Sequence, residues 1–268
     1  YCDYQIPAPK VCPSCRGDSI RFGGLGTQKL EEEVRAKFPS ASVLRMDSDT
    51  MQRPNAHEQA LDRFRSGEVK ILVGTQMIAK GLDFPNVHLV GVINADTALH
   101  FPDFRAGERT FQLVTQVAGR TGRGDQDGRV LVQTYSPEHL AIVAATQHDY
   151  KLFAEEELPG REEFGYPPFC GMIRLIIRGA NNENSMQYAQ HLAQCCQVAI
   201  DQSPSVAIRM LGPAPAPITK VRDKYRYHVL LLCDNITAIQ EVIARVYEEQ
   251  KPPDDIQWVV DVDPQNML

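Results

Sequence analysis

The sequence lacks long hydrophobic runs and any leader-like opening. Its longest apolar stretches, such as residues 87–93, are far shorter than the ~18 residues that a membrane-spanning helix needs. No charged segment followed by an apolar one opens the chain. Cysteines number 7, an odd count, and the adjacent Cys195 and Cys196 would point apart on a helix. These features favour a reduced, cytoplasmic protein without a membrane anchor.

The sequence also has no excess of positive charge, since its formal net charge is -6 at pH 7. Proteins that coat nucleic acid by bulk charge are usually basic, so any DNA contact must come from local patches. With 268 residues, 43% of them hydrophobic, the chain is long enough for one large domain or two smaller ones. Glycine and proline are too few for a disordered chain.

Strands alternating with helices organise the first half of the chain. Residues 1–17 carry cysteines and show no periodicity, whereas residues 18–147 alternate between the two element types and predict an α/β domain with a parallel sheet covered on both faces. Strands are expected at 19–22, 42–46, 69–73, 87–93 and 129–134. Thr27 is expected to cap a helix whose apolar positions are Leu30, Val34 and Phe38.

A different pattern follows the Glu-rich segment 148–168, which ends in two prolines and is interpreted as a linker. Residues 169–268 predict the order β-α-β-β-α-β, which is typical of ferredoxin-like α+β domains. The expected strands are 171–178, 206–211, 226–233 and 256–262, the helices are 183–201 and 235–249, and a Pro-rich loop occupies 212–217.

The string at residues 116–124 places Arg120 and Arg123 among glycines at the end of an expected helix. Planar, permanently charged guanidinium groups suit bidentate phosphate contact and stabilise charge on a transferring phosphoryl group. The alternative is a surface turn with solvated arginines.

A second string, residues 74–85, directly follows an apolar strand. Open α/β sheets bind ligands at the C-terminal ends of their strands. Backbone N–H groups and the Thr75 hydroxyl are therefore suited to a DNA phosphate. Asp83 is suited to accept a hydrogen bond from a ribose hydroxyl, or simply to cap a turn.

Together these two strings resemble motifs V and VI of superfamily 2 helicases. The whole chain resembles the primosomal protein N′ (PriA) family of DNA helicases, which restart bacterial replication at stalled forks. The resemblance rests on the order of several strings, namely 24–27, 45–50, 74–85, 116–124, 212–215, 261–264 and the cysteine-bearing opening.

The resemblance implies a role for individual residues of a RecA-like second helicase lobe at 18–147. Arg123 resembles an arginine finger toward the ATP γ-phosphate, with Arg120 beside it and Gln116 facing the nucleotide. The remaining implied contacts are nucleotide binding by Gly81 and Asp83, and DNA or interlobe contacts by Gly26, Thr27, Thr75 and Gln76.

The family also implies a cofactor, ATP with Mg²⁺, and partners. These are forked or single-stranded DNA, single-strand-binding protein and other primosome proteins, and the chain is expected to be a monomer. The sequence departs from a complete motor, because the dipeptide Gly-Lys never occurs and no acidic Asp-Glu box is present. Without a phosphate-cradling loop and a metal ligand, the chain should complete an ATPase site but not form one. It is interpreted as cut from a longer protein, since it begins with Tyr1.

Two rival interpretations remain. One is another superfamily 2 translocase, against which the C-terminal pattern and the cysteines argue. The other is a non-catalytic module that docks on fork DNA or on single-strand-binding protein.

The spacing Cys12-Pro-Ser-Cys15 suits one half of a tetrahedral zinc site better than a redox pair, because a strand rather than a helix is expected to follow. Cys2 is interpreted as the remaining half of a second pair. The resemblance implies two interleaved structural Zn²⁺ sites, both incomplete in this chain, so residues 1–17 are a remnant of a zinc-binding region.

The last chemically suggestive segment holds Lys220, Arg222, Lys224 and Arg226 with Tyr225 and Tyr227. Cations with interleaved aromatics suit single-stranded or forked DNA through phosphate contact and base stacking. The alternative is a solvated hairpin loop. His228 is expected to be an ordinary strand residue.

Overall fold

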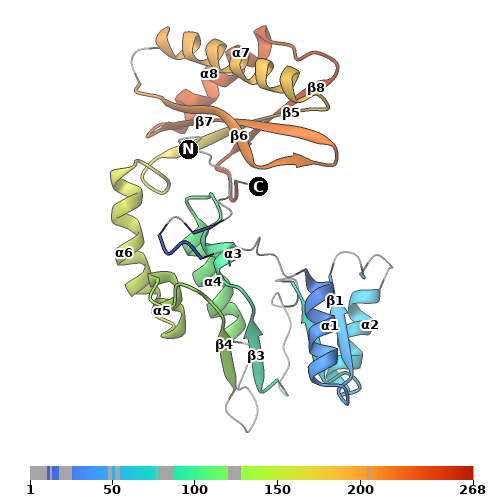
Figure 1. Ribbon diagram of the computed structural model, residues 1–268. Helices are drawn as coiled ribbons and strands as arrows, with labels where there is room; N and C mark the ends of the chain where they lie inside the picture. The colour runs from blue at the N-terminus through green and yellow to red at the C-terminus, as the bar shows by residue number, and fades with distance from the viewer. Residues whose placement is uncertain are drawn as a thin grey trace. The chain divides into compact units, whose positions relative to one another are not determined.

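The structure is a computed structural model that describes residues 11–12, 14–17, 26–47, 50–51, 55–75, 78, 87–119, 128–203 and 206–267. The chain divides into two compact units. Of the described residues, those up to His100 and those from Gly107 to Phe153 form the N-terminal unit, and Phe101–Ala106 with those from Ala154 onward form the C-terminal unit (Figure 1). No described helix combines the length and apolar character needed to cross a membrane.

The N-terminal unit alternates helices and strands as expected. Its elements are α1 (Thr27–Lys37), β1 (Val43–Met46), α2 (Ala56–Arg65), β2 (Ile71–Gly74), β3 (Leu89–Val92), α3 (Asp96–Leu99), α4 (Ala106–Ala118), β4 (Arg129–Val132), α5 (Leu140–Thr146) and the start of α6 (Tyr150–Glu163). Most of the segment expected as a linker is therefore helical.

The described strands of this unit form two separate two-stranded parallel sheets, β1 with β2 and β3 with β4. The expectation of one sheet covered on both faces is wrong for these strands. Leu89 and Leu131 remain 60% and 61% exposed, so the described residues leave that face of the β3–β4 pair largely uncovered. The strand expected at 19–22 lies outside the described residues.

Helix α1 forms where it was predicted, but none of its residues is fully buried and Phe38 is 54% exposed beyond its end. Leu30 and Val34 are half-buried, and polar contacts add to the packing of the helix. Arg35 donates from Nη2 to Glu31 at 2.8 Å and to the carbonyl of Val43 on β1 at 2.6 Å. The periodicity of Leu30, Val34 and Phe38 therefore predicted the helix but not its packing.

The C-terminal unit follows the order β-α-β-β-α-β. Its elements are β5 (Gly171–Gly179), α7 (Asn182–Asp201), β6 (Arg209–Val221), β7 (Lys224–Cys233), α8 (Ile236–Glu249) and β8 (Ile256–Val262). The strands form one antiparallel sheet in the order β6-β7-β5-β8. Both helices begin at asparagines, Asn181 and Asn235, whose side chains accept from the first-turn N–H groups of Asn184 and Thr237.

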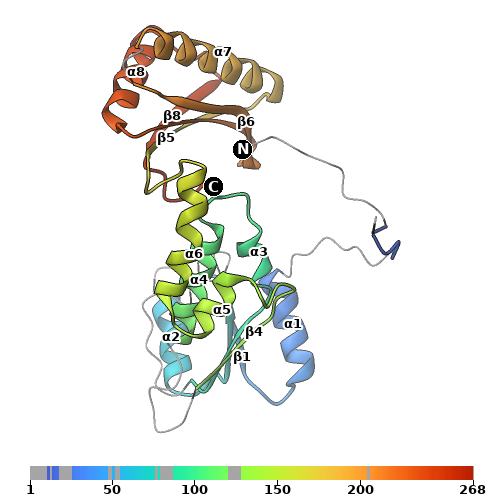
Figure 2. The same cartoon turned by 90° about the vertical axis from the view of Figure 1, so that its left-hand side faces the viewer.

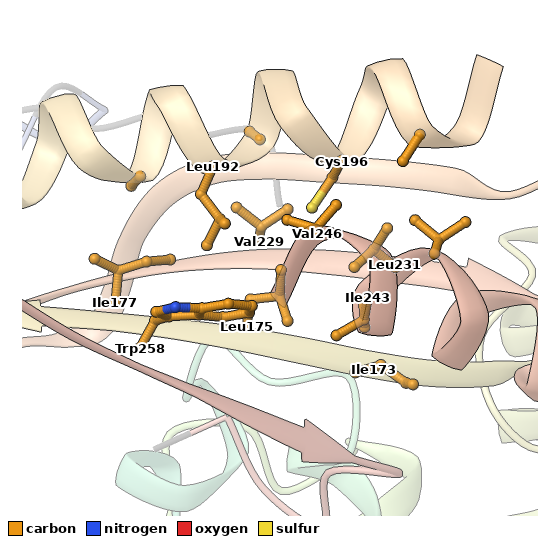
Figure 3. Close-up of a cluster of buried hydrophobic side chains, with 14 of the residues drawn as sticks. Ile173, Leu175, Ile177, Leu192, Cys196, Val229, Leu231, Ile243, Val246 and Trp258 are labelled. Atoms are coloured by element: carbon orange, nitrogen blue, oxygen red, sulfur yellow. The ribbon is translucent and has the colours of Figure 1, made fainter. Parts of the chain in front are cut away.

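Helices α7 and α8 cover one face of this sheet (Figure 2). Successive strand residues point to opposite faces, so Ile173, Leu175 and Ile177 of β5 all point toward the helices. They meet Leu192 and Cys196 of α7, and the same core continues to Val229, Leu231, Ile243, Val246 and Trp258 (Figure 3). Burial of this apolar area is the main term that stabilises the unit.

The Pro-rich segment 212–217 was expected as a loop but lies within β6, a correction to the prediction. Strand β6 is at the edge of the sheet, where proline's missing N–H is tolerated. The register shifts between Leu211 and Ala214 and again between Pro215 and Lys220 absorb the irregularity. Gly212 adopts φ +94°, a conformation that favours glycine.

The opposite face of the sheet carries a smaller core in the C-terminal unit. Met172, Leu230, Leu232 and Met267 are buried together there, and Phe104 and Tyr166 pack against them. The rings of Phe104 and Tyr166 stack with centroids 5.1 Å apart and planes inclined by 9°. A segment from the middle of the sequence, 101–106, thus belongs to the C-terminal unit.

Asp103 fastens that segment to the end of the chain. Its Oδ2 accepts from the N–H of Met267 at 2.9 Å, and its Oδ1 accepts from the N–H of Arg105 at 2.9 Å. Arg105 donates from Nη1 to Gln265 at 3.1 Å. The carboxylate of Asp103 therefore joins two segments 164 residues apart in sequence. We call residues 101–106 with these contacts the Asp103 clamp.

Candidate functional site

The C-terminal end of β2 positions Thr75, as the sequence predicted. A Cβ at Gly74 would overlap the carbonyl oxygen of Met46, so only glycine lets β1 and β2 approach here. Thr75 follows at an exposed position, and its carbonyl accepts from the N–H of Ile78 at 3.1 Å in a turn. The hydroxyl-bearing residue is thus at the strand end where α/β sheets bind ligands. Gln76, Gly81 and Asp83 lie outside the described residues.

Gly26 and Thr27 are at the start of α1, but Thr27 is not its cap. Gly26 is the N-cap residue, and Thr27 is the first helical residue. The Thr27 hydroxyl instead donates to Oδ2 of Asp47 at 2.6 Å. The capping side chain belongs to the residue before the first helical one, which here is Gly26 and has no side chain to accept from the helix N–H groups.

Asp47 belongs to the string at 45–50, for which the sequence predicted no individual function. Its Oδ1 accepts from the N–H and the hydroxyl of Thr50, both at 3.0 Å, and Arg45 Nε lies 3.2 Å from its Oδ2. The hydrogen bond from Thr27, followed by those from Thr50 and the charge of Arg45, lowers the pKa of Asp47 to about 2. The ionised carboxylate thus joins the loop after β1 to the start of α1.

Replacing Thr27 with valine is expected to raise the pKa of Asp47, because the largest stabilising contact of the carboxylate is lost. In the folded protein this pKa is below the unfolded value of about 3.9. The stabilisation is therefore present above pH ~4 and lost as pH falls toward 2. Carboxyl NMR titration and acid-unfolding midpoints measure both effects, with Thr146→Val, which removes an exposed hydroxyl of α5, as the control. An unchanged Asp47 pKa would contradict this assignment.

Helix α4 presents Gln116 to solvent. Phe111 and Val114 of the same helix are buried in the core of the N-terminal unit, and Gln116 is on the exposed side. The helix ends at Ala118, where the N–H of Gly119 donates to the carbonyl of Thr115. Of the predicted catalytic set, the structure describes only Gln116, since Arg120 and Arg123 lie outside the described residues.

The predicted basic segment is a β-hairpin between β6 and β7. Arg222 and Asp223 form its two-residue turn with φ values of 50° and 61°, and Val221 pairs with Lys224 on either side. Positive φ at both turn positions is the feature of type I′ hairpins. The segment is therefore a tight hairpin, and DNA binding by its cations stays a prediction.

Tyr227 was expected to be available for base stacking, and this is wrong. Its side chain is 8% exposed in the core beneath α7 and α8, and its hydroxyl donates to Asn182 Oδ1 at 2.9 Å. It shares strand parity with Val229 and Leu231, which also point toward the helices. Tyr225 is half-buried, with Lys220 Nζ 5.2 Å from its ring centroid.

The four predicted cations do not share one surface. Lys220 lies opposite Tyr225 in the register, on the helix side, and pairs with Asp223 at 3.2 Å. Arg222 is in the turn. Lys224 and Arg226 alternate with the core residues and lie on the helix-free face, where Lys224 Nζ donates to Gln257 Oε1 at 3.3 Å. His228 follows on that face, and burial, together with Arg174 and Arg226, lowers its pKa to about 4.

Cys12 and Cys15 form a compact turn. The N–H of Cys12 donates to Gly17 and that of Arg16 donates to Cys12, both at 2.8 Å. Both thiols are free, and backbone N–H groups of Cys15 and Ser14 lower the pKa of Cys12. Two such thiolates fit half of a tetrahedral site. The described residues contain no group of three potential metal ligands, and Cys2 lies outside them.

Two known protein families match the chain. Residues 20–125 match "Helicase conserved C-terminal domain", and residues 162–265 match "Primosomal protein N C-terminal domain". The first match covers the strand end with Thr75 and the helix with Gln116. The chain thus carries a helicase C-terminal domain, which defines its class.

Several relatives match nearly all of the chain, and each is a replication restart protein PriA. Identity is 42% to that of Bacillus subtilis over 94% of this chain, 40% to that of Synechocystis over 98%, and 38% to that of Treponema pallidum over 100%. The chain spans 31%, 31% and 40% of these relatives' lengths. The chain belongs to the PriA family.

Among solved structures, the chain is similar to the "De novo designed protein Foldit4", with 17% identity and a TM-score of 0.26 over 36% of this chain and 98% of that chain. A likeness at this level supports no argument.

Proposed function

We propose that this chain is the second motor lobe and C-terminal domain of an ATP-dependent DNA helicase that acts at stalled replication forks and in primosome assembly. The single observation that carries the proposal is the helicase-domain match over residues 20–125 in a PriA-family chain. The exposed Thr75 at the end of β2 and the exposed Gln116 on α4 support it, since both are accessible to ligands.

Within this proposal, the residues divide between two ligands. Arg123 and Arg120 act on the γ-phosphate of ATP, Gln116 faces the nucleotide, and Gly81 and Asp83 bind its sugar. Gly26, Thr27, Thr75 and Gln76 contact the DNA backbone or the first lobe. ATP with Mg²⁺ binds mainly to a first lobe that this chain does not contain, so the chain alone is expected to be inactive as an ATPase.

The C-terminal domain is proposed to be ferredoxin-like, which the strand order β6-β7-β5-β8 supports. We place the whole protein in the cytoplasm, with forked or single-stranded DNA, single-strand-binding protein and other primosome proteins as partners.

DNA-stimulated ATP hydrolysis by the longer protein tests the function. A motor hydrolyses ATP faster when single-stranded or forked DNA is added, whereas a docking module does not hydrolyse it. Absence of ATPase activity with every DNA tested would remove the motor proposal in favour of docking on forks or on single-strand-binding protein.

We also propose structural zinc. Cys12 and Cys15 supply two thiolate ligands, and Cys2 belongs to the second of two interleaved pairs. The double variant Cys12→Ser, Cys15→Ser of the longer protein is expected to lose bound zinc, because two of four ligands are gone. Metal content measured by mass spectrometry checks this, with Cys195→Ser of α7 as the control. Unchanged zinc in the double variant would refute the ligand assignment.

A further inference from the structure

Three arginines gather on the helix-free face of the C-terminal sheet. Arg174 and Arg178 of β5 and Arg226 of β7 share strand parity with Met172 and Leu230, which point away from α7 and α8. Arg178 lies directly opposite Arg226 in the antiparallel register. Like charges at directly opposed positions of a sheet repel, so this pair destabilises the free protein.

Polar atoms beside this pair lack partners. Arg178 Nε and His228 Nδ1 are buried and have no hydrogen-bond partner in the part of the chain that the structure describes. His228 is only 4% exposed. It lies two residues after Arg226 on the same face of β7, opposite Ile176 of β5. A buried donor or acceptor without a partner destabilises the fold, because its hydrogen bonds to water are lost and not replaced. The arrangement is thus unfavourable until a polar group supplies the missing contacts.

Among the residues that the structure describes, acidic side chains compensate only part of this charge. Asp261 of β8 lies 2.8 Å from Arg174 Nη2 and so neutralises the arginine farthest from the hairpin. Burial, followed by the charges of Arg174 and Arg178, lowers the pKa of Arg226. The Arg178–Arg226 pair is half-buried, and Lys224 continues the positive row on the same face of β7. The local field therefore favours an anion at this pair.

We propose that Arg178 and Arg226 form a phosphate-binding site for the backbone of single-stranded nucleic acid, with Lys224 holding the next phosphate. Two guanidinium groups on neighbouring strands present planar pairs of donors, the geometry that suits phosphate oxygens. The proposal rests on the proposed function, since it specifies how the C-terminal domain binds DNA. It also replaces stacking on Tyr227, which is buried, with phosphate contact on the sheet.

The test is binding of a fluorescently labelled single-stranded oligonucleotide to the 268-residue chain across a salt series. The double variant Arg178→Gln, Arg226→Gln is expected to bind at least about tenfold more weakly at low salt. Loss of two phosphate contacts should also reduce the slope of log affinity against log salt by about 1.4. The double variant Arg178→Lys, Arg226→Lys keeps the charge but not the paired donors. Its affinity is expected to fall between those of the wild type and the double Gln variant.

A matched control removes the same charge from the helix side of the same domain. Arg245 of α8 and Lys251 just beyond it are exposed, and their double Gln variant should bind like the wild type with the same slope. Circular dichroism shows whether each variant is folded, and the loss of repulsion should leave Arg178→Gln, Arg226→Gln at least as stable as the wild type. Equal affinity and slope in the two Gln variants would overturn the proposal.

Inorganic phosphate tests whether the site binds a free anion instead of nucleic acid. If phosphate raises the wild-type Tm but oligonucleotide affinity is the same in all variants, the site holds a free anion and the nucleic-acid assignment is overturned. The motor is judged separately, by ATP hydrolysis of the longer protein. If the Arg178→Gln, Arg226→Gln variant loses oligonucleotide binding while the longer protein shows no DNA-stimulated ATPase activity, the phosphate site is supported and the motor proposal fails.

Discussion

Replacing Arg123 with alanine in the longer protein is expected to lower kcat for DNA-stimulated ATP hydrolysis by about a thousandfold. Under the proposed function its guanidinium stabilises charge on the γ-phosphate as it transfers, so the loss is about 4 kcal/mol of transition-state stabilisation. Binding of the nucleotide itself should change far less, because the first lobe holds most of it. Steady-state ATPase assays with saturating single-stranded DNA measure kcat, and a fluorescent nucleotide measures binding.

The control for this experiment is Arg129→Ala, which removes an exposed arginine of β4 close by in sequence. It should leave kcat within about threefold of the wild type. If Arg123→Ala also stays within that range, the arginine-finger assignment fails, even if the protein remains an ATPase.

Asp103→Ala is expected to destabilise the C-terminal unit by about 3 kcal/mol. Asp103 is 7% exposed, and its carboxylate accepts from the N–H groups of Met267 and Arg105. Hydrogen bonds to charged groups contribute about 1.5–3 kcal/mol each, and the substitution leaves both donors without this acceptor. Urea unfolding followed by circular dichroism gives the stability change, and hydrogen exchange should show Met267 losing protection.

Asp103→Asn provides the graded comparison. The amide keeps one acceptor oxygen in nearly the same shape, so about half of the loss is expected. An alanine variant within about 0.5 kcal/mol of the wild type would show that the Asp103 clamp contributes little to stability.

The C-terminal elements were predictable because their patterns are strong. Strand β8 was expected at 256–262 and is Ile256–Val262, and helix α8 was expected at 235–249 and is Ile236–Glu249. Alternation of buried and exposed residues fixes such strands, and asparagine caps fix the helix starts. The same alternation also placed Tyr227 in the core, so that error was avoidable from the sequence.

Other features depend on contacts that no local pattern records. Whether residues 212–217 form a loop or an edge strand depends on their neighbour in the sheet, because prolines are excluded only from central strands. Thr27 became a partner of Asp47, 20 residues away, instead of a cap. The opposition of Arg178 and Arg226 appears only once the strand order is known. The strings that carry the resemblance are local in sequence; Thr75 and Gln116 of these strings are both exposed, and their roles stay predictions.

The Asp103 clamp has a consequence for exchanging parts between PriA-family proteins. A chimera joined within residues 148–168 would combine a C-terminal domain from one parent with residues 101–106 from another. Phe104 would then have to stack on a foreign Tyr166, and Asp103 would have to accept from a foreign chain end. The C-terminal domain is discontinuous in sequence, so a functional exchange should transplant residues 101–106 together with everything from residue 154 onward.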